Sequence, residues 1–165
     1  DAQHGISAFS YCFEENERPG VFYLDKAKEL GIPEGKLWQE LQNGNSIEVD
    51  GKKIESSQVT GEKRSGKKIG ISGDTRPTKK LERFFKNSDY LSFDCTFLFD
   101  LKDRAIETNH STAKEAAELA KNANVKNLIL THFSARYNDE SVLLNEAKQI
   151  HESVIAAKDI LGNEI

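Results

Sequence analysis

The sequence predicts a layered α/β fold that carries a smaller, partly helical insertion near its N-terminal end. The main evidence is an alternation, from Gly66 onward, of short apolar runs with longer amphipathic runs. Such an alternation is typical of strands followed by helices that cover a sheet. The second observation is a change of character over 15–56, where Gly, Pro and Asn turns interrupt short runs. With 165 residues, the chain is long enough to bury a core.

The expected elements before and within the insertion are short. Residues 5–13 alternate apolar and small side chains and predict a strand. Helical runs are expected over 24–30 and 35–42, because each has a thin apolar stripe. A β-hairpin is expected over 46–56, where an Asp-Gly pair supplies the turn.

The remainder of the chain predicts three successive strand–helix pairs. Strands are expected over 67–72, 89–97 and 125–133, and the helices that follow them over 78–87, 111–123 and 139–157. Each helical stretch has 10 to 20 residues, which is the length that a helix needs to cross back over a sheet. We therefore expect a sheet covered by these helices.

Composition excludes several classes of protein. A hydrophobic content of 37% and a charged content of 30% are those of an ordinary soluble chain. No apolar run approaches the length of a membrane-spanning helix, and no basic-then-apolar leader precedes Asp1. Two cysteines, Cys12 and Cys95, are expected to be buried free thiols. A cytoplasmic protein without membrane contact is the expectation.

Positive charge gathers in one part of an otherwise acidic chain. The net charge is −4, yet nine basic residues and only three acidic ones lie between Glu62 and Lys86. This excess of positive charge is suited to bind a polyanion such as RNA. A solvated helix face next to a basic turn is the alternative, and the sequence leaves both readings open.

Polar side chains follow the predicted strands at the points where they end. Asp74 follows the first strand, Asp94 lies within the second, His110 comes after it, and His132 ends the third, while His4 lies near the N-terminus. Because strand ends and their loops converge in α/β sheets, these side chains are expected to form one cluster. Imidazole and carboxylate groups together suit Zn²⁺. Ordinary turn and cap-neighbour roles remain the alternative for each residue alone.

Six motifs, in this order, resemble the C-terminal half of the ribonuclease Z family, the tRNA 3′-processing endonucleases of the metallo-β-lactamase superfamily. They read "HGISAFSYCFEE", "RPGVF", "GIPEGKLWQEL", "SGDTRP", "NHST" and "LILTHFSARY". The resemblance covers essentially the whole chain. It implies the C-terminal half of an αββα sandwich whose two halves meet at a site for two Zn²⁺ ions, with 15–56 as an inserted arm.

The resemblance also implies roles for the clustered residues. His4, Asp74 and His132 would be zinc ligands, with Asp74 bridging the two ions. His110 would protonate the leaving 3′ oxygen. Asp94, which stands where the family usually has a glutamate, would hydrogen-bond His110 and fix its tautomer.

Precursor tRNA is the implied substrate, and a homodimer is the implied assembly. The arm at 15–56 would grip the tRNA away from the cleavage site, with Trp38 available for stacking or packing. Lys63, Arg64 and Arg76 are candidates for phosphate contact, and Arg136 would hold a phosphate or brace the metal loop.

The HxHxDH motif, which supplies most zinc ligands in this family, does not occur in the 165 residues. Three ligands cannot close the coordination of two Zn²⁺ ions, and half a sandwich leaves one face of its sheet unburied. We therefore expect an N-terminal half elsewhere, and a chain that does not cleave RNA by itself. Two other functions stay open: another metallo-β-lactamase-fold phosphodiesterase or hydrolase, and a non-catalytic RNA-binding or dimerisation module.

Overall fold

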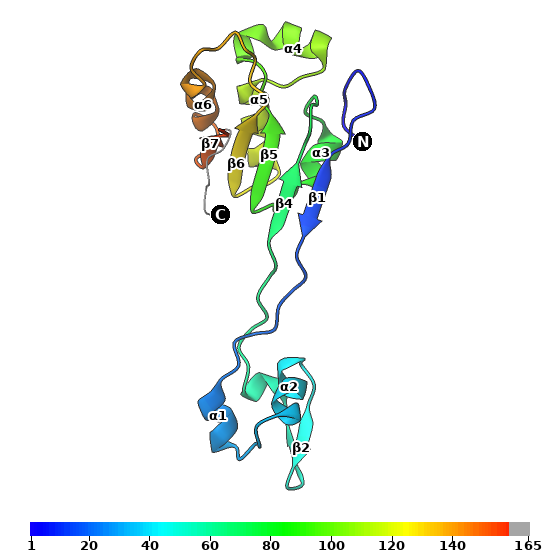
Figure 1. The fold of residues 1–165 in the computed structure, drawn as a ribbon, viewed down its shortest axis with the longest axis vertical. Coiled ribbons are helices and arrows are strands. Elements are labelled where there is room, and N and C mark those ends of the chain that lie inside the picture. The colour runs from blue at the N-terminus through cyan, green and yellow to red at the C-terminus, as the bar shows by residue number, and fades with distance from the viewer. Residues whose placement is uncertain (159–165) are drawn as a thin grey trace. The chain divides into compact units, whose positions relative to one another are not determined.

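The computed structural model describes residues 1–158 and divides into two compact units. The sheet unit consists of residues 1–14 and the chain from Lys67 onward, and the inserted unit consists of residues 15–66 (Figure 1). The insertion extends beyond the predicted boundary at residue 56. Backbone bridges from Thr60 to Phe22 and from Arg64 to Arg18 explain this, because they tie the returning chain to the segment that enters the unit.

The sheet unit is built on five strands in the order β1-β4-β5-β6-β7 (Figure 1). These are β1 (Tyr11–Glu14), β4 (Lys68–Ile71), β5 (Tyr90–Asp94), β6 (Asn127–Thr131) and β7 (Val154–Ala156). β1 is antiparallel to β4, and the other neighbours are parallel. The carboxyl ends of β4, β5 and β6 therefore lie at one edge of the sheet, as the sequence predicted for the site.

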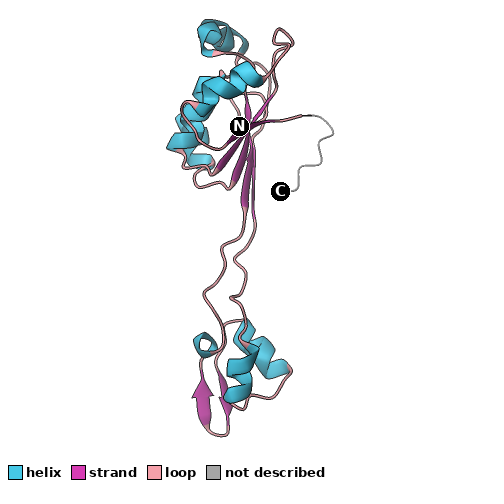
Figure 2. Ribbon diagram, turned by 90° about the vertical axis from the view of Figure 1, so that its left-hand side faces the viewer, coloured by secondary structure: helices cyan, strands magenta, loops and turns pink. Residues whose placement is uncertain are grey.

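Helices cover one face of this sheet (Figure 2). They are α3 (Lys79–Phe84), α5 (Ala113–Asn122) and α6 (Ser141–Lys148). A further helix, α4 (Lys102–Thr108), follows a 3₁₀ turn at Phe99–Leu101 and lies beyond the strand ends (Figure 1). The predicted helices over 78–87 and 111–123 are confirmed with shorter bounds. α4 was not predicted, because its seven residues bury only Ala105 and so show no apolar stripe.

The predicted helix over 139–157 is wrong in its second half. α6 ends at Lys148, and residues 154–156 form the edge strand β7, in which Val154 pairs with Leu128 of β6. The β-branched pair Val154 and Ile155 favours a strand, and the backbone groups of β6 offer it a ladder. His151 lies between the two elements, buried, with Nε2 2.9 Å from the Val125 carbonyl oxygen.

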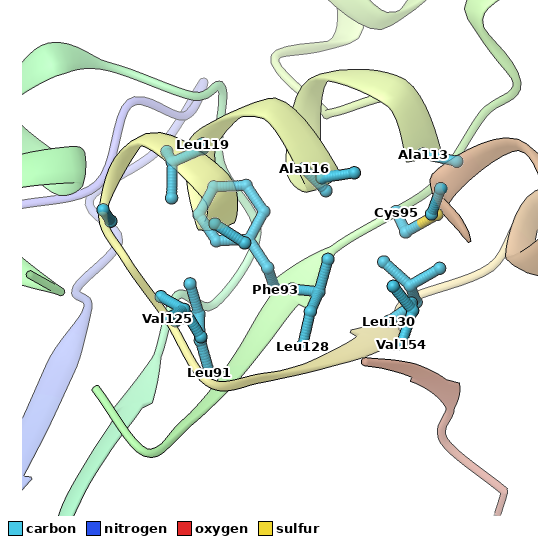
Figure 3. Packing of buried hydrophobic residues seen from close by; sticks show 14 of the residues in the cluster. Leu91, Phe93, Cys95, Ala113, Ala116, Leu119, Val125, Leu128, Leu130 and Val154 are labelled. Atoms are coloured by element: carbon cyan, nitrogen blue, oxygen red, sulfur yellow. The ribbon is translucent and has the colours of Figure 1, made fainter. Parts of the chain in front are cut away.

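The core lies between α5 and the sheet (Figure 3). Phe93, Leu91, Leu128 and Leu130 point from β5 and β6 toward the helix and have no exposed surface. The helix meets them with four fully buried alanines, Ala113, Ala116, Ala117 and Ala120. These small side chains let the helix approach the sheet closely, and each buried Leu or Phe contributes roughly 1.5–3 kcal/mol.

The opposite face of the sheet is apolar and exposed. Alternate residues point to it, and Tyr11, Phe13, Ile71 and Ile155 are 56%, 59%, 41% and 46% exposed. Within residues 1–158 no helix covers this face (Figure 2). An apolar sheet face of this kind is a surface that another layer of protein is suited to cover.

The inserted unit has a small core of its own. Its elements are α1 (Leu24–Glu29), α2 (Lys36–Gln42), the hairpin strands β2 (Ile47–Val49) and β3 (Lys52–Ile54), and a 3₁₀ turn at Ser56–Gln58. The predicted short helices and the hairpin are confirmed. Asp50 and Gly51 both have positive φ, at 50° and 73°, as a two-residue hairpin turn requires.

Neither cysteine forms a disulfide. Cys95 is fully buried, and this burial is the main cause that raises the pKa of its thiol. Cys12 is only half-buried, contrary to expectation, because it lies on the edge strand β1. No helix in residues 1–158 is both long enough and apolar enough to pass through a bilayer.

Candidate metal centre

Asp74 lies on a tight turn just past the end of β4. Gly73 has a φ of +63°, and a Cβ at this position would lie 3.1 Å from the Phe9 carbonyl oxygen. The turn therefore needs glycine. Ser72, before it, accepts a hydrogen bond of 3.0 Å from the Asp94 N–H through its Oγ. Asp74 is thus held beyond the strand with its side chain 43% exposed.

His4 is held beside this turn by backbone pairing across 72 residues of sequence. The Gln3 N–H donates to Thr75 Oγ1 at 2.9 Å. The Arg76 N–H donates to the Gln3 carbonyl oxygen at 3.0 Å. The N-terminal segment therefore places the His4 ring next to Asp74.

His110 is positioned by the loop between α4 and α5. Asn109 ends α4 in the left-handed conformation, and Thr112 caps α5 in a capping box with Glu115. The Arg76 guanidinium donates to the His110 carbonyl oxygen and binds both oxygens of Glu115, one at 2.8 Å. The loop that carries Asp74 and the loop that carries His110 are thereby joined.

This buried ion pair changes the acidity of Glu115. Burial by itself acts to raise the pKa of the carboxyl group, and it is the largest single influence. Hydrogen bonds and charge from Arg76, with hydrogen bonds from Thr112, together outweigh it, so the pKa is lowered. Glu115 therefore stays ionised at neutral pH and keeps Arg76 in place.

His132 follows β6 with a φ of 61°. Such a conformation is uncommon for a residue other than glycine, and it costs roughly 1–3 kcal/mol. It turns the ring back over the strand ends, where it stacks on His110 with ring centroids 4.8 Å apart. Backbone strain at this position indicates that the placement of the ring serves the site.

The structure brings predicted zinc ligands close together. His132 Nε2 lies 3.3 Å from Asp74 Oδ2. Potential ligand atoms of His4, Asp74 and His110 lie within 4.8 Å of one another, as do those of Asp94, His110 and His132. His4 and His132, which are far apart in sequence, thus each lie close to Asp74, and His110 belongs to both groups. By geometry alone His110 is also close enough to bind a cation there.

Each clustered histidine forms its side-chain hydrogen bond through Nδ1. His4 Nδ1 lies 3.2 Å from the Asn109 carbonyl oxygen, and His110 Nδ1 lies 2.7 Å from Asp94 Oδ2. Both partners are acceptors, so both Nδ1 atoms carry hydrogen. In the neutral rings the Nε2 atoms then keep their lone pairs and are available as ligands. Such bonds orient histidines that bind metals. This donor set of imidazole Nε2 and carboxylate oxygen fits Zn²⁺.

Asp94 is the buried centre of the network. It receives hydrogen bonds from the N–H groups of Thr75, Thr96 and Ser111, from the Thr96 hydroxyl, and from His110. Although Asp is one methylene shorter than the Glu that the sequence resemblance led us to expect here, its carboxylate reaches the His110 ring at 2.7 Å. Such a carboxylate is suited to orient an imidazole and to stabilise its positive form.

Three predicted substrate residues belong to the inserted unit and not to the sheet unit that carries this cluster. Trp38 packs against the small core, contacts the Phe22 ring at a tilt with ring centroids 5.3 Å apart, and donates to the Ile32 carbonyl oxygen. Lys63 and Arg64 are exposed. The structure therefore gives Trp38 a packing contact and leaves the two cations at the surface.

The two remaining arginines have different surroundings. Arg136 is exposed beyond β6, where it lies over the Phe97 ring and donates to Ser134 Oγ at 3.0 Å. Arg76 is buried in its ion pair with Glu115. Sequence reasoning missed Glu115, although "TAKE" at 112–115 is a capping-box pattern that signals it.

The chain is similar to proteins named ribonuclease Z. It is 65% identical over 164 residues to one from Nitrosopumilus maritimus and 49% identical over 165 residues to one from Archaeoglobus fulgidus. Each alignment covers 99% of this chain but only 55% and 54% of the relative. The chain thus spans about half the length of these relatives. No family model matches it.

Among solved structures, the chain is similar to the metallo-β-lactamase fold protein YhfI from Bacillus subtilis. The TM-score is 0.52 at 27% identity, over 56% of this chain and 38% of the other. The layered sheet described above is thus part of a metallo-β-lactamase fold. By sequence, the chain matches about half the length of proteins named ribonuclease Z, and its sheet has the metallo-β-lactamase fold.

Proposed function

We propose that this chain is part of a zinc-dependent endoribonuclease that removes the 3′ trailer from precursor tRNA and leaves a 3′ hydroxyl. The observation that carries the proposal is the approach of two histidines to Asp74: His4 shares a group of potential ligands with it, and His132 Nε2 lies 3.3 Å from Asp74 Oδ2. Kinship with proteins named ribonuclease Z supports it.

His4, Asp74 and His132 would hold two Zn²⁺ ions, with the Asp74 carboxylate between them. Bound zinc lowers the pKa of water and neutralises the charge that develops on the phosphate. Further ligands, in an HxHxDH motif, would come from an N-terminal half that packs on the exposed sheet face with Tyr11 and Phe13. We expect residues 1–165 without that half to be inactive.

His110 would act as the general acid. In its doubly protonated form the ring donates the Nε2 proton to the leaving 3′ oxygen, while Nδ1–H stays bonded to Asp94 at 2.7 Å. The Asp94 carboxylate stabilises the positive ring and keeps it from rotating. His110 therefore serves as proton donor in this proposal and not as a zinc ligand.

The inserted unit would hold the tRNA, with Lys63 and Arg64 as phosphate contacts, and Arg136 would contact a phosphate near the cleavage site. Trp38 supports the unit by packing. We leave Arg76 out of the RNA contacts, because Glu115 already binds its guanidinium. A homodimer in the cytoplasm completes the proposal.

The test compares two substrates with the full-length protein carrying zinc. The proposal expects cleavage of precursor tRNA at the start of the trailer, and much weaker cleavage of a bis(aryl)phosphate. Preference for the small diester would favour another hydrolase of this fold. Binding of precursor tRNA without cleavage, in a protein that contains no zinc, would favour a non-catalytic module.

A further inference from the structure

A chain of hydrogen bonds joins the two stacked histidines through the buried residues Asp94 and Thr96. His110 Nδ1 lies 2.7 Å from Asp94 Oδ2. The Thr96 hydroxyl lies 2.8 Å from Asp94 Oδ1 and 2.8 Å from His132 Nδ1. Thr96 has no part in the function proposed above, yet it alone links the carboxylate to His132 among the hydrogen bonds of residues 1–158.

The number of hydrogens available decides which group donates in each of these hydrogen bonds. The Thr96 hydroxyl has one hydrogen and two neighbouring acceptor sites. Asp94 already receives the N–H groups of Thr75 and Ser111 and the proton of the His110 ring, so its oxygens are occupied as acceptors and it is ionised. An ionised carboxylate is the stronger acceptor. The hydroxyl hydrogen therefore goes to Asp94, and the hydroxyl oxygen accepts from His132.

This direction fixes the His132 tautomer. A hydrogen on Nδ1 leaves the lone pair of the neutral ring on Nε2, and Nε2 lies 3.3 Å from Asp74 Oδ2. Two acceptor atoms facing each other at this distance repel unless a cation lies with them. The arrangement is therefore poised for a cation shared by His132 and Asp74.

Thr96 is held rigidly enough to impose this choice. Its side chain is buried, and its backbone is tied on both sides: its N–H donates to the Ser111 carbonyl oxygen at 3.0 Å, and its own carbonyl oxygen accepts from Ser134 at 3.2 Å. The hydroxyl thus has a fixed position between Asp94 and His132.

We infer that Thr96 is a positioning residue that keeps the hydrogen of His132 on Nδ1 and so directs Nε2 to the metal. The inference rests on the proposed zinc site. It also assigns Asp94 a second role, because one carboxylate then orients the proton donor His110 directly and the ligand His132 through Thr96.

The first test measures the tautomer in the full-length, metal-free protein with ¹⁵N-labelled histidine. Two-bond ¹H–¹⁵N spectra at pH 8 distinguish hydrogen on Nδ1 from hydrogen on Nε2, and His132→Asn identifies the signal of His132. We expect the Nδ1–H form in the wild type and in Thr96→Ser, and a mixture of forms in Thr96→Val. A wild-type ring with its hydrogen on Nε2 would overturn the inference, whatever the stability of the variants.

The second test measures zinc affinity by competition with a chromophoric chelator. Loss of an outer-shell partner typically costs 10–100-fold in metal affinity, so Thr96→Val is expected to bind zinc about 10–100-fold more weakly and Thr96→Ser to remain close to wild type. Unchanged affinity in a folded Thr96→Val protein would contradict the inference. Full zinc binding and the Nδ1–H form without any cleavage of precursor tRNA would instead refute the proposed function alone.

Discussion

The two units of this chain differ in what their side chains are used for. In the sheet unit, the strand ends carry a buried polar network in which Asp94 alone receives five hydrogen bonds. In the inserted unit, the buried residues are apolar, from Ala27 to Val59, and the basic side chains lie at the surface. The comparison supports the proposal that the chemistry belongs to the strand ends of the sheet unit and that the inserted unit serves binding.

The largest expected effect comes from Asp74. Replacing it with Asn removes the charge that would hold the two zinc ions, so we expect precursor tRNA cleavage to fall on the order of 10³-fold or more, together with the zinc content. Atomic absorption and single-turnover cleavage measure the two effects. Asp103→Asn, an exposed position on α4, is the matched control and should change neither. If Asp74→Asn kept its full zinc content and activity, the zinc site could not lie at the strand ends.

Asp94→Asn should act through His110. We expect kcat to fall about 10²–10³-fold, because the ring loses the carboxylate that orients and charges it. A double-mutant cycle with His110→Ala is the check. If Asp94 acts mainly through His110, the double variant is only slightly slower than His110→Ala alone, by the part of the effect that reaches His132 through Thr96. Fully multiplied losses would show that Asp94 does not act through His110.

Arg76→Met tests the brace between the loops of the sheet unit. It leaves the buried Glu115 charge without its partner, which costs about 3 kcal/mol in the free energy of unfolding, a factor of about 10² in the folding equilibrium. Urea unfolding measures this loss. The double variant with Glu115→Gln should recover part of it, and an Arg76→Met protein as stable as the wild type would show that the ion pair is dispensable.

The same brace predicts a pH dependence. The pKa of Glu115 is lowered in the fold, so its contribution to stability is present above its ordinary pKa near 4.5 and is lost as pH falls through the lowered value. In Arg76→Met, burial is no longer outweighed and acts to raise the pKa of Glu115. The free-energy cost of burying its negative charge therefore disappears when acid protonates the carboxylate. The stability gap between the two proteins should therefore narrow as pH falls, first through the raised pKa of Glu115 in Arg76→Met, above about 4.5, and then through its lowered pKa in the wild type. A gap independent of pH would contradict this account of Glu115.

The smallest effect on chemistry is expected from removing the inserted unit. Glu14 and Lys68 are paired in the antiparallel β1–β4 ladder, so an Asn-Gly turn can replace residues 15–67 without disturbing the sheet. We expect KM for precursor tRNA to rise about tenfold or more, at 1.4 kcal/mol per factor of ten, with hydrolysis of a bis(aryl)phosphate unchanged. Equal loss of both activities would show that the insertion supports the catalytic site itself.

Much of this organisation could be predicted from the sequence. Alternating strands and helices predicted a sheet covered by helices, and polar residues after each strand predicted that Asp74, His110 and His132 lie at one edge. One exception is the segment 5–13, of which only the end, from Tyr11, lies in a strand. The other, at 139–157, arose because apolar spacing alone does not distinguish a helix from an edge strand. Val154 and Ile155 form a strand only because β6 is available to pair with them.

The finer chemistry of the site could not be predicted in this way. Sequence spacing does not show which ring nitrogen faces inward, and Thr96 has no pattern that marks it as the link to His132. Arg76 was expected among the RNA contacts because it lies in a basic stretch. Its partner Glu115 is 39 residues away and becomes visible only when α5 packs on the sheet.

The central claim is that zinc binds at the strand ends of the sheet unit. An anomalous difference map from crystals of the full-length protein grown with zinc tests it most directly. The account predicts density within about 2.0–2.2 Å of His4 Nε2, His132 Nε2 and an oxygen of Asp74. Zinc bound through Nδ1 of His132, or density at other residues with these three side chains left unliganded, would contradict it.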